Sequence, residues 1–416
     1  MNLMIIPGKI KQSLSQVTIV QEIVKFVTNK QLIQLKWLSD LKLVSHSRGW
    51  NYQTSQSSAI QRCEPSKTIS EDILGNINTG KKIFKNHREN NLAKAEMLYS
   101  SLYAVTRYPV PETFICEMSD VFLLVPNGGI LTNQLEIVTQ SAARNTINPP
   151  LYIHSYPNKN DCLSGTYVSF LGLWGDIHYS HWLLDILPRV SLLKHLSSNL
   201  QDDLQFIVPN QLQTYHIEAL TLLGIPQERW ISMPNGVYRL EKFVLCHAAE
   251  RSMVVNGKHF SEVRNSLVKA VIGSEINSKV TRRVYISRRN SRRKIINEEE
   301  LMPVLDKYGF EVYCCEKMSL KEQIRLFSET EVVLGAHGAG IHNQIFCNPG
   351  AKIIEIYNPI WVYHGTFRIA NLMNHEHWHT FGEDTGAENS IYMNPNKLDK
   401  VLSYALRQND FIEKIY

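Results

Sequence analysis

A glycine-rich segment late in the chain carries the clearest chemical signal. Residues 331–343 read Glu-Val-Val-Leu-Gly-Ala-His-Gly-Ala-Gly-Ile-His-Asn, an apolar run followed by closely spaced glycines. Glycine lets a backbone approach a ligand closely, and the first turn of a helix offers unpaired N–H groups to an anion. The segment predicts a diphosphate site, and the alternative is a simple strand-to-helix turn. The predicted contacts are His337, Gly338, Ala339, Gly340 and Asn343.

A basic run lies upstream of this turn. Seven Lys or Arg residues fall between Arg282 and Lys294, around a short apolar stretch. A strand there would leave Ser287 and Arg288 at the sheet edge where ligands bind, and the planar fork of arginine fits phosphate. We predict that Arg288 and Arg293 bind phosphate, with Ser287 beside them. The alternative is a solvated face or a nucleic-acid patch.

A third group combines histidines with a carboxylate. His181, Asp185 and Arg189 follow each other at helical i, i+4 and i+8 spacing, and His178 lies just before them. Imidazole titrates near neutrality and an adjacent carboxylate tunes it, so such a pair can take a proton from an attacking hydroxyl. The sequence predicts His178, His181 and Asp185 as catalytic. The alternative is a surface ion pair between Asp185 and Arg189.

Two further groups allow more than one chemistry. Glu355 is a lone carboxylate in the apolar run 352–357, and a buried carboxylate needs a partner. A ribose diol and an arginine of the basic run are the two candidates. His375, His377 and His379 alternate as metal ligands on a strand would, but no fourth ligand accompanies them. The sequence also lacks an Asp-X-Asp motif, so we predict no metal site and no cofactor.

The elements that must position these residues alternate along the chain. Apolar runs typical of strands are each followed by a helical pattern, which indicates βαβ units and a parallel sheet with ligands at the carboxyl ends of its strands. The fold class is therefore α/β. The predicted strands are 167–171, 205–208 and 243–246 in a first half, and 283–287, 310–314, 331–334 and 352–357 in a second. Asn297 and Ser319, each followed by Glu three residues later, predict capping boxes.

The N-terminal part has a different pattern. Residues 9–43 carry apolar residues at helical spacing, which predicts one or two amphipathic helices that pack on the main body. Contact of these helices with a membrane surface or a partner is the alternative. Residues 46–90 are polar and predict a loop or linker.

Composition restricts the remaining functions. The chain has 416 residues and a formal net charge of +5, which is too mild for a dedicated nucleic-acid-binding protein. Its 7 cysteines are scattered without Cys-X-X-Cys spacing, which argues against a disulfide framework and a zinc site. We recognise neither a signal peptide nor an apolar run long enough to span a bilayer. We therefore expect a cytoplasmic protein, with contact at the inner face of the membrane left open.

Three motifs, in matching order, resemble the family 61 glycosyltransferases. They are residues 178–189, the Tyr-Ile-Ser-Arg sequence at 285–288, and residues 335–343 followed by the Glu355 strand. The resemblance covers residues 167–358, and we place the chain in the bacterial capsule and exopolysaccharide branch. It implies a GT-B fold, in which two Rossmann-like domains face each other across a cleft. We predict four parts: an N-terminal helical extension and linker (1–95), an acceptor domain (96–275), a nucleotide-sugar domain (276–395), and a C-terminal helix (396–416), whose crossing back to the first half is left open.

The resemblance also implies a reaction. It is the inverting, metal-independent transfer of a sugar from a nucleotide-sugar, a UDP-sugar by preference, to a glycan or lipid-linked glycan in bacterial surface polysaccharide synthesis. By position, Arg288, His337, Gly338 and Gly340 resemble donor-phosphate contacts, Glu355 a further donor contact, and the His178, His181, Asp185 group the acceptor side. Two other hypotheses are a catalytically idle nucleotide-sugar or glycan-binding protein and a basic nucleic-acid-binding protein. The sequence leaves the sugar, the linkage and the oligomeric state open.

Overall fold

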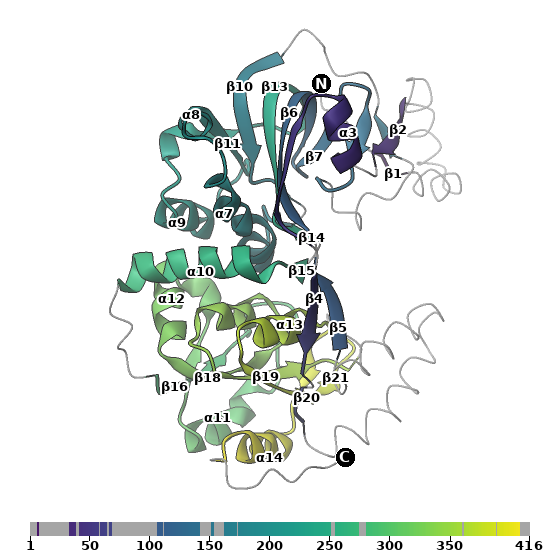
Figure 1. The fold of residues 1–416 in the computed structure, drawn as a ribbon. Coiled ribbons are helices and arrows are strands. Elements are labelled where there is room, and N and C mark those ends of the chain that lie inside the picture. Colours follow the sequence, from purple (N-terminus) through teal and green to yellow (C-terminus); the bar gives the residue numbers. More distant parts are fainter. Residues whose placement is uncertain are drawn as a thin grey trace, which may run out of the picture. The chain divides into compact units, whose positions relative to one another are not determined.

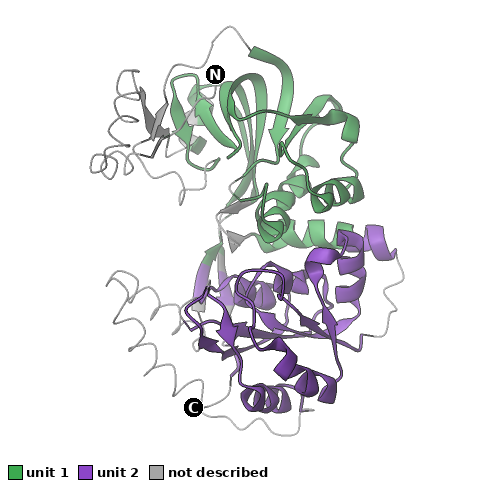
Figure 2. Ribbon diagram, turned by 180° about the vertical axis from the view of Figure 1, so that it is seen from behind, with its two compact units in different colours: residues 1–59, 109–267 green, residues 60–108, 268–416 purple. Residues whose placement is uncertain are grey.

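The computed structural model of the chain divides into two compact units, coloured separately in Figure 2. Unit 1 comprises residues 1–59 and 109–267, and unit 2 comprises residues 60–108 and 268–416. The residues that the structure describes are 6–7, 33–38, 41–57, 59–64, 66–68, 106–110, 112–141, 151–153, 162–172, 174–250, 254–273, 280–359, 362–387 and 389–407.

Unit 1 is built on a mixed sheet. Its longest strands, β6 (Thr113–Val125) and β13 (Gly236–His247), pair antiparallel over almost their whole length. Strands β10 (Cys162–Ser169), β11 (Leu204–Val208) and β12 (Trp230–Ser232) continue the sheet in parallel from β13. The predicted alternation of strand and helix is therefore confirmed for this half of unit 1.

The remaining elements of unit 1 extend or cover this sheet. The further strands are β1 (Ile6–Pro7), β2 (Ile33–Leu38), β3 (Asn51–Gln56), β7 (Gly129–Thr132), β8 (Glu136–Val138) and β9 (Leu151–Ile153), with the separate pair β14 (Ala249–Glu250) and β15 (Val254–Val255). The helices are α3 (Leu41–Ser47), α6 (Tyr179–His181), η3 (Trp182–Ile186), η4 (Leu187–Arg189), α7 (Val190–Leu193), α8 (Ser198–Asp203), α9 (Thr214–Leu222), η5 (Gln227–Arg229) and α10 (Gly257–Ile272), which contains the boundary between the units.

Unit 2 is built on a parallel sheet whose spatial order is β17-β16-β18-β19-β20. The strands are β16 (Arg282–Ile286), β17 (Phe310–Tyr313), β18 (Thr330–Ala336), β19 (Lys352–Tyr357) and β20 (Glu376–Phe381). The chain reverses its direction of winding between β16 and β18. Ligands of open α/β sheets bind outside the carboxyl ends of the strands at such a switch point. The topology of unit 2 therefore favours a site at the ends of β16 and β18.

The helices of unit 2 confirm one predicted cap and correct another. Ser319 and Glu322 bond each other's backbone N–H groups at the start of α12, so this capping box is confirmed. Asn297 does precede α11, but its side-chain amide binds the backbone of Met393 instead of capping the helix. The helical elements of unit 2 are α11 (Glu298–Lys307), η6 (Cys315–Lys317), α12 (Leu320–Ser328), η7 (Ala339–Phe346), α13 (Gly365–Leu372) and α14 (Pro395–Ala405).

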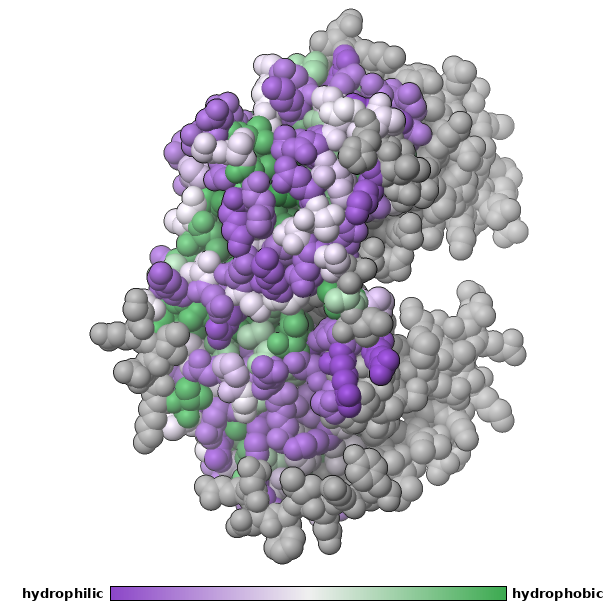
Figure 3. Space-filling view, in the orientation of Figure 1, coloured by the Kyte–Doolittle hydropathy of each residue, from purple (hydrophilic) through white to green (hydrophobic). Residues whose placement is uncertain are grey.

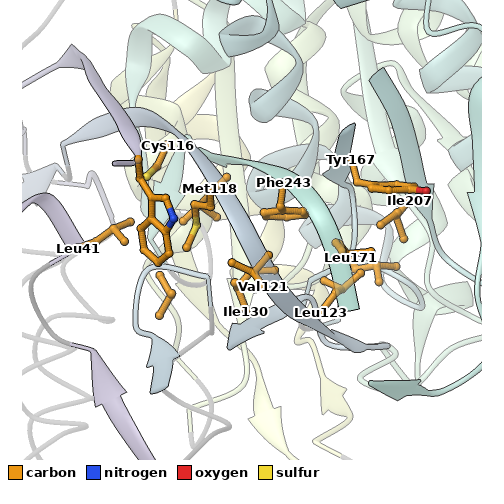
Figure 4. Close-up of a cluster of buried hydrophobic side chains, with 14 of the residues drawn as sticks. Leu41, Cys116, Met118, Val121, Leu123, Ile130, Tyr167, Leu171, Ile207 and Phe243 are labelled. Carbon is orange, nitrogen blue, oxygen red and sulfur yellow. The ribbon is translucent and has the colours of Figure 1, made fainter. Parts of the chain in front are cut away.

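Each unit has its own apolar core. Figure 4 shows the unit 1 cluster, in which Met118, Val121 and Phe243 from β6 and β13 lie on one face of the sheet. In unit 2, helices α11 and α14 pack side by side against the sheet, as Figure 1 shows. On the face drawn in Figure 3, hydrophilic residues cover most of the described surface and hydrophobic ones form small groups. None of the described helices is long and apolar enough to cross a bilayer.

Several expectations about the two ends of the chain need correction. Residues 33–38 form strand β2 instead of a helix, and residues 51–56 form β3 instead of a linker. Most of the predicted helical region 9–43 lies outside the described residues. The C-terminal helix α14 packs on α11 within unit 2, and the crossing of the C-terminal segment to the first half stays a prediction. The four-part division of the chain stays a prediction.

Short strand pairings also lie outside the two large sheets or at their edges, and one of them matters for the site. Strand β4 (Ala59–Cys63) pairs with β5 (Thr106–Val110), and β21 (Glu383–Asp384) pairs with β22 (Ile391–Tyr392). After β4, Lys67 forms a parallel bridge with Trp378 of β20. The N-terminal part of unit 2, far from β20 in the sequence, thus lies along the edge of its sheet.

Buried histidines make the stability of unit 1 dependent on pH. His247 is 5% exposed, and burial lowers its pKa to about 4. In the unfolded chain His247 takes up a proton near pH 6.5, whereas in the folded chain it stays neutral down to about pH 4. The free energy of unfolding therefore falls as pH drops from 6.5 towards 4. We expect this residue to remove roughly 3 kcal/mol of the unfolding free energy over that interval. Urea unfolding at pH 7 and pH 4.5 checks this, and an equal pH dependence in His247→Asn would contradict it.

Candidate functional site

The glycine-rich turn and the basic run meet at the switch point of unit 2. Strand β18 ends at Ala336, and η7 begins at Ala339, directly after Gly338. A Cβ atom on Gly338 would collide with the guanidinium of Arg288, and one on Gly340 would lie 2.9 Å from Ile286 Cγ2. A side chain at Gly338 would displace the Arg288 guanidinium, and one at Gly340 would crowd Ile286, so these two glycines let the end of β16 pack closely against the turn.

Arg288 is the cation that lies against this turn. Its Nη2 donates to the backbone oxygen of Arg292 at 2.9 Å, and its Nε is buried with no hydrogen-bond partner in the described part of the chain. Burial, and then the neighbouring charge of Arg293, lower the pKa of Arg288 to about 10. The side chain is therefore still charged at neutral pH, and a bound anion would relieve both effects.

A second cation lines a small pocket at the same sheet edge. Arg293, His337, Asn358 and Asn389 form its polar wall, and Ala336 and Ile356 part of its apolar wall. Burial lowers the pKa of Arg293, and the nearby charge of Glu355 opposes that shift. The structure thus brings Arg288, Arg293, His337 and the glycines into one part of unit 2, as the sequence predicted.

Glu355 lies beneath this pocket and has a different role from the one predicted. Its side chain is fully buried, and its oxygens accept from His337 Nδ1 at 2.6 Å, Thr366 Oγ1 at 2.8 Å and His377 Nε2 at 3.2 Å. Burial raises the pKa of Glu355, but these two histidines hold it below its ordinary value. The partner of Glu355 is thus neither a ribose nor an arginine, because both oxygens already bind side chains of the protein.

Two other predicted donor contacts also point into the protein. Ser287 is fully buried, and its Oγ donates to Glu298 at 2.9 Å. Asn343 is fully buried, and its Nδ2 donates to Gln323 on α12 at 2.7 Å. These side chains hold the strand and the turn in place, and their direct contact with a ligand stays a prediction. Spacing located the turn correctly but could not show which way each side chain points.

Three of the seven cations in the basic run form ion pairs within unit 2. Arg282 binds Glu311 at 2.6 Å, Arg283 binds Glu331 at 3.0 Å, and Arg289 binds Glu298 at 3.0 Å. Cations that are already paired contribute little to a loose nucleic-acid patch. The run therefore contains three structural arginines besides the two that lie at the turn. The carboxylates that pair with these three arginines lie 9 to 48 residues away from them in the sequence, so the spacing within the basic run could not reveal them.

The alternating histidines of β20 are part of the buried core of unit 2. His377 and His379 share one face, as predicted for a strand, and both bind Ser66 Oγ, at 2.6 and 2.7 Å. His375 Nε2 binds the backbone oxygen of Gln344 at 3.0 Å instead. In the part of the chain that the structure describes, no group of three or more His, Cys, Asp or Glu is arranged to hold a metal ion.

In unit 1, His181 and Asp185 form the predicted pair. His181 Nδ1 lies 2.7 Å from Asp185 Oδ2, and the two side chains are 16% and 14% exposed. A carboxylate accepts hydrogen bonds, so Nδ1 carries the hydrogen and Nε2 is left as a proton acceptor. The pair lies where the short helix α6 gives way to the π-helical turn η3, an irregularity frequent at functional sites.

Of the residues near this pair, Arg189 does not lie beside Asp185 as the helical spacing predicts, whereas His178 does lie close to the pair. Arg189 turns away and donates to the backbone oxygens of Ser169 and Leu171 at 2.8 and 2.7 Å, so the alternative ion pair with Asp185 is not formed. His178 lies beside the pair, with its ring centroid 6.0 Å from that of His181. The structure therefore brings all three predicted catalytic side chains together within unit 1.

Sequence reasoning missed an exposed tryptophan next to this group. Trp174 is 43% exposed and has φ of +66°, a strained conformation for a large residue. Its ring centroid is 5.4 Å from that of His178. The loop is fixed from below, because His216 Nε2 binds the backbone oxygen of Gly175 at 2.9 Å and a Cβ on Gly172 would collide with Ile186. A strained loop that displays an indole ring is typical of a binding surface.

The motifs that lie in these two sites can be compared with known proteins. The Glycosyltransferase 61 family matches residues 179–354. The matched segment, which is less than half of the chain, is thus that of a glycosyltransferase family. It contains His181, Asp185, Arg288 and the glycine-rich turn, and it ends one residue before Glu355.

Individual relatives of this glycosyltransferase segment are similar over short stretches. The EGF domain-specific O-linked N-acetylglucosamine transferase of Drosophila melanogaster is 35% identical over 77 residues, 18% of this chain and 15% of that protein. A rice (Oryza sativa subsp. japonica) protein, Beta-1,2-xylosyltransferase RCN11, is 41% identical over 44 residues, 11% of this chain and 8% of that protein. The chain therefore matches under a fifth of the length of these two relatives.

A solved structure gives a weaker match. The E. coli heptosyltransferase WaaC with ADP is 10% identical, covers 58% of this chain and all of its own, and superposes with a TM-score of 0.29. A superposition this poor carries no argument about the fold. The mixed α/β architecture of the two units therefore stands on their own strands and helices.

Proposed function

We propose that this protein transfers a sugar from a nucleotide-sugar donor, a UDP-sugar by preference, to a hydroxyl of a glycan acceptor. The observation that carries the proposal is the packing of Arg288 against Gly338, which gathers a half-buried cation and the backbone of a glycine-rich turn at the switch point of a parallel sheet. Such a place suits a diphosphate, because arginine and backbone N–H groups both bind phosphate oxygens. The glycosyltransferase match of this segment supports the same donor class.

In the proposed reaction, unit 1 carries the acceptor. The acceptor hydroxyl gives its proton to His181 Nε2, while Asp185 holds the imidazole through Nδ1. The oxygen attacks the anomeric carbon from the face opposite the diphosphate, and the bond to the phosphate oxygen breaks with its electron pair. The transition state is oxocarbenium-like, and the configuration inverts. Arg288 and Arg293 balance the charge that develops on the leaving diphosphate, as a divalent metal does in other transferases.

The finer parts of the proposal go beyond the two units. A GT-B arrangement, in which the acceptor and donor halves face each other across a cleft, would bring His181 and Arg288 to the same substrate. The roles in bacterial surface polysaccharide synthesis and at the cytoplasmic face of a membrane also stay predictions, and the two relatives named above come from a fly and a plant.

Calorimetric titration tests the proposal. UDP, GDP, CMP and TDP are titrated into the full chain in the presence of EDTA. We expect one of them to bind at micromolar concentration without a metal, and Arg288→Ala to weaken that binding at least tenfold. Binding by none of them would overturn the proposal. Binding of a nucleotide without transfer from its sugar conjugate to any glycan would support an idle binding protein instead.

The exposed tryptophan gives a prediction for the acceptor. If the indole ring of Trp174 covers an apolar face of a sugar, Trp174→Ala loses that buried contact and raises the acceptor KM about tenfold, with little change in donor KM. Steady-state kinetics with a short glycan acceptor measure both constants. Tyr404→Ala is the matched control, because Tyr404 is 48% exposed and lies in unit 2. An unchanged acceptor KM in Trp174→Ala would contradict this contact.

A further inference from the structure

A chain of buried polar side chains runs behind His337. It begins in the segment 66–68, which lies along the edge of β20: the backbone N–H of Lys67 donates to His377 at 2.8 Å, and that of His379 donates to Lys67 at 2.9 Å. Ser66, on this segment, is 5% exposed and binds both histidines through Oγ. An N-terminal segment of the chain thus contacts the core of unit 2 directly beneath the candidate donor pocket.

The direction of each hydrogen bond in this chain follows from Glu355. An ionised carboxylate only accepts, so His377 must carry its hydrogen on Nε2, which lies 3.2 Å from Glu355 Oε2. His377 Nδ1 then accepts from Ser66 Oγ at 2.6 Å. Ser66 Oγ in turn accepts from His379 Nδ1 at 2.7 Å. His379 therefore carries its hydrogen on Nδ1, and since burial lowers the pKa of His379 to about 3, the ring is neutral at pH 7.

The same reasoning fixes the ring of His337. Its Nδ1 donates to Glu355 Oε1 at 2.6 Å, and Thr366 Oγ1 donates to the same oxygen at 2.8 Å. His337 is held on one side only, so its Nε2 is the atom left for the pocket that it lines with Arg293. An imidazole that is oriented in this way by a carboxylate donates from Nε2 to a phosphate oxygen when it is protonated.

We propose that Ser66 and His377 are positioning residues for the donor site, because they hold Glu355 and through it fix the orientation and tautomer of His337. The inference rests on the proposed function and extends it to residues that the family match does not reach. Ser66 and His377 both lie outside residues 179–354. The segment 66–68 thus becomes part of the donor site.

A role in packing alone does not account for this arrangement. A buried carboxylate with two histidines and a serine is expensive to desolvate, and apolar side chains of similar volume would fill the space at lower free energy. The chain also ends at a pocket, on a residue that faces a cation. A buried polar chain that orients one surface-facing imidazole is the pattern expected behind a ligand-binding histidine.

Other charged and titratable groups also lie near these hydrogen-bonded side chains. Arg293 and Tyr357 interact with Glu355, and Lys397 and His377 act on the charge of His379. These groups stay in place in every variant proposed below except where His377 is changed. A difference between variants therefore reports the change in the hydrogen bonds that link Ser66, His377, Glu355 and His337.

The first experiment removes one hydroxyl at a time from the same segment. Ser66→Ala breaks the link to His377, whereas the control Thr68→Ala removes a hydroxyl that binds only the backbone oxygen of His379, at 2.7 Å. We expect Ser66→Ala to lower UDP affinity about fivefold and Thr68→Ala less than twofold, by calorimetry. Equal losses in both variants would overturn the proposal.

The second experiment separates positioning from stability. His377→Phe removes the donor to Glu355, and His377→Gln keeps an N–H at a similar place. Glu355 then loses one of the hydrogen bonds that fix its position, so His337 is held less firmly, and UDP affinity at pH 7 should fall about fivefold in His377→Phe, by calorimetry. The affinity should return towards that of the unchanged protein in His377→Gln. An equal loss of affinity in both variants would contradict the proposal.

A third readout needs no ligand. Imidazole ¹⁵N NMR of the full chain labelled at histidine should show His337 with its hydrogen on Nδ1 in the unchanged protein, and a mixture of tautomers in Ser66→Ala and His377→Phe. The same tautomer in all three proteins would overturn the positioning role. Failure of every nucleoside diphosphate to bind the unchanged protein, with the tautomer still shifting, would instead overturn the proposed function alone.

Discussion

Replacing Arg288 with Ala should lower kcat for sugar transfer by about 10²–10³ while the protein stays folded. The guanidinium lies against the turn at Gly338, where charge develops on the leaving diphosphate, and such preorganised charge acts mainly on the transition state. Steady-state kinetics with the donor that binds best measure the change. Because the Nε of this side chain is buried and unpaired in the described part of the chain, its removal also relieves a desolvation penalty, so the melting temperature should hold or rise.

Two variants control this result. Arg292→Ala keeps the backbone oxygen that accepts from Arg288, so we expect less than a threefold change. Gly338→Ala should reproduce most of the loss, because the new Cβ displaces the guanidinium. In a double-mutant cycle the two losses should then overlap and not add. Additive losses, or a normal rate in Arg288→Ala, would show that this arginine does not serve the leaving group.

Replacing His181 with Ala should lower kcat by about 10²–10⁴, the usual contribution of a general base. His181 Nδ1 is occupied by Asp185 at 2.7 Å, so Nε2 is the free basic atom, and alanine leaves the acceptor hydroxyl without a proton acceptor. The affinity for UDP should not change, since the donor contacts belong to unit 2. Asp185→Asn should show a smaller loss, because it disturbs the orientation of the imidazole but leaves Nε2 present.

The exposed His195 provides the matched control for this histidine. His195→Ala should retain full activity, since its ring contacts Ser55 and not the His181–Asp185 pair. A rate in His181→Ala within tenfold of the unchanged protein would contradict a role as base. A parallel loss of UDP affinity would point to a folding defect.

The sequence predicted the strands of unit 2 better than the strands near the N-terminus of the chain. Strands 283–287, 331–334 and 352–357 were visible because buried parallel strands are continuous apolar runs, and each lies within or next to an observed strand. The N-terminal strands were not visible, since the residues of β2 and β3 pair with residues of β8 and β6 that lie 57 to 100 positions away along the chain. Pairing over such distances leaves no local periodicity to detect.

The sequence located the motifs of the candidate site but did not show which side chains their residues bind. Arg288 and the glycine turn were found because phosphate chemistry requires those residue types after a strand. The bonds of Ser287 and Asn343 to Glu298 and Gln323 were not predicted, because spacing does not show which way a side chain points. Ser66 gave no signal, since a single serine in a polar stretch gains its role only through contacts 311 and 313 residues away.

A crystal structure of the full chain with UDP tests the central claim most directly. The account predicts that the diphosphate lies at the carboxyl ends of β16 and β18, bonded to the guanidinium of Arg288, to the backbone N–H groups of Ala339 and Gly340, and to His337 Nε2. A diphosphate bound anywhere else in the chain, with Arg288 still packed on an empty glycine turn, would contradict it.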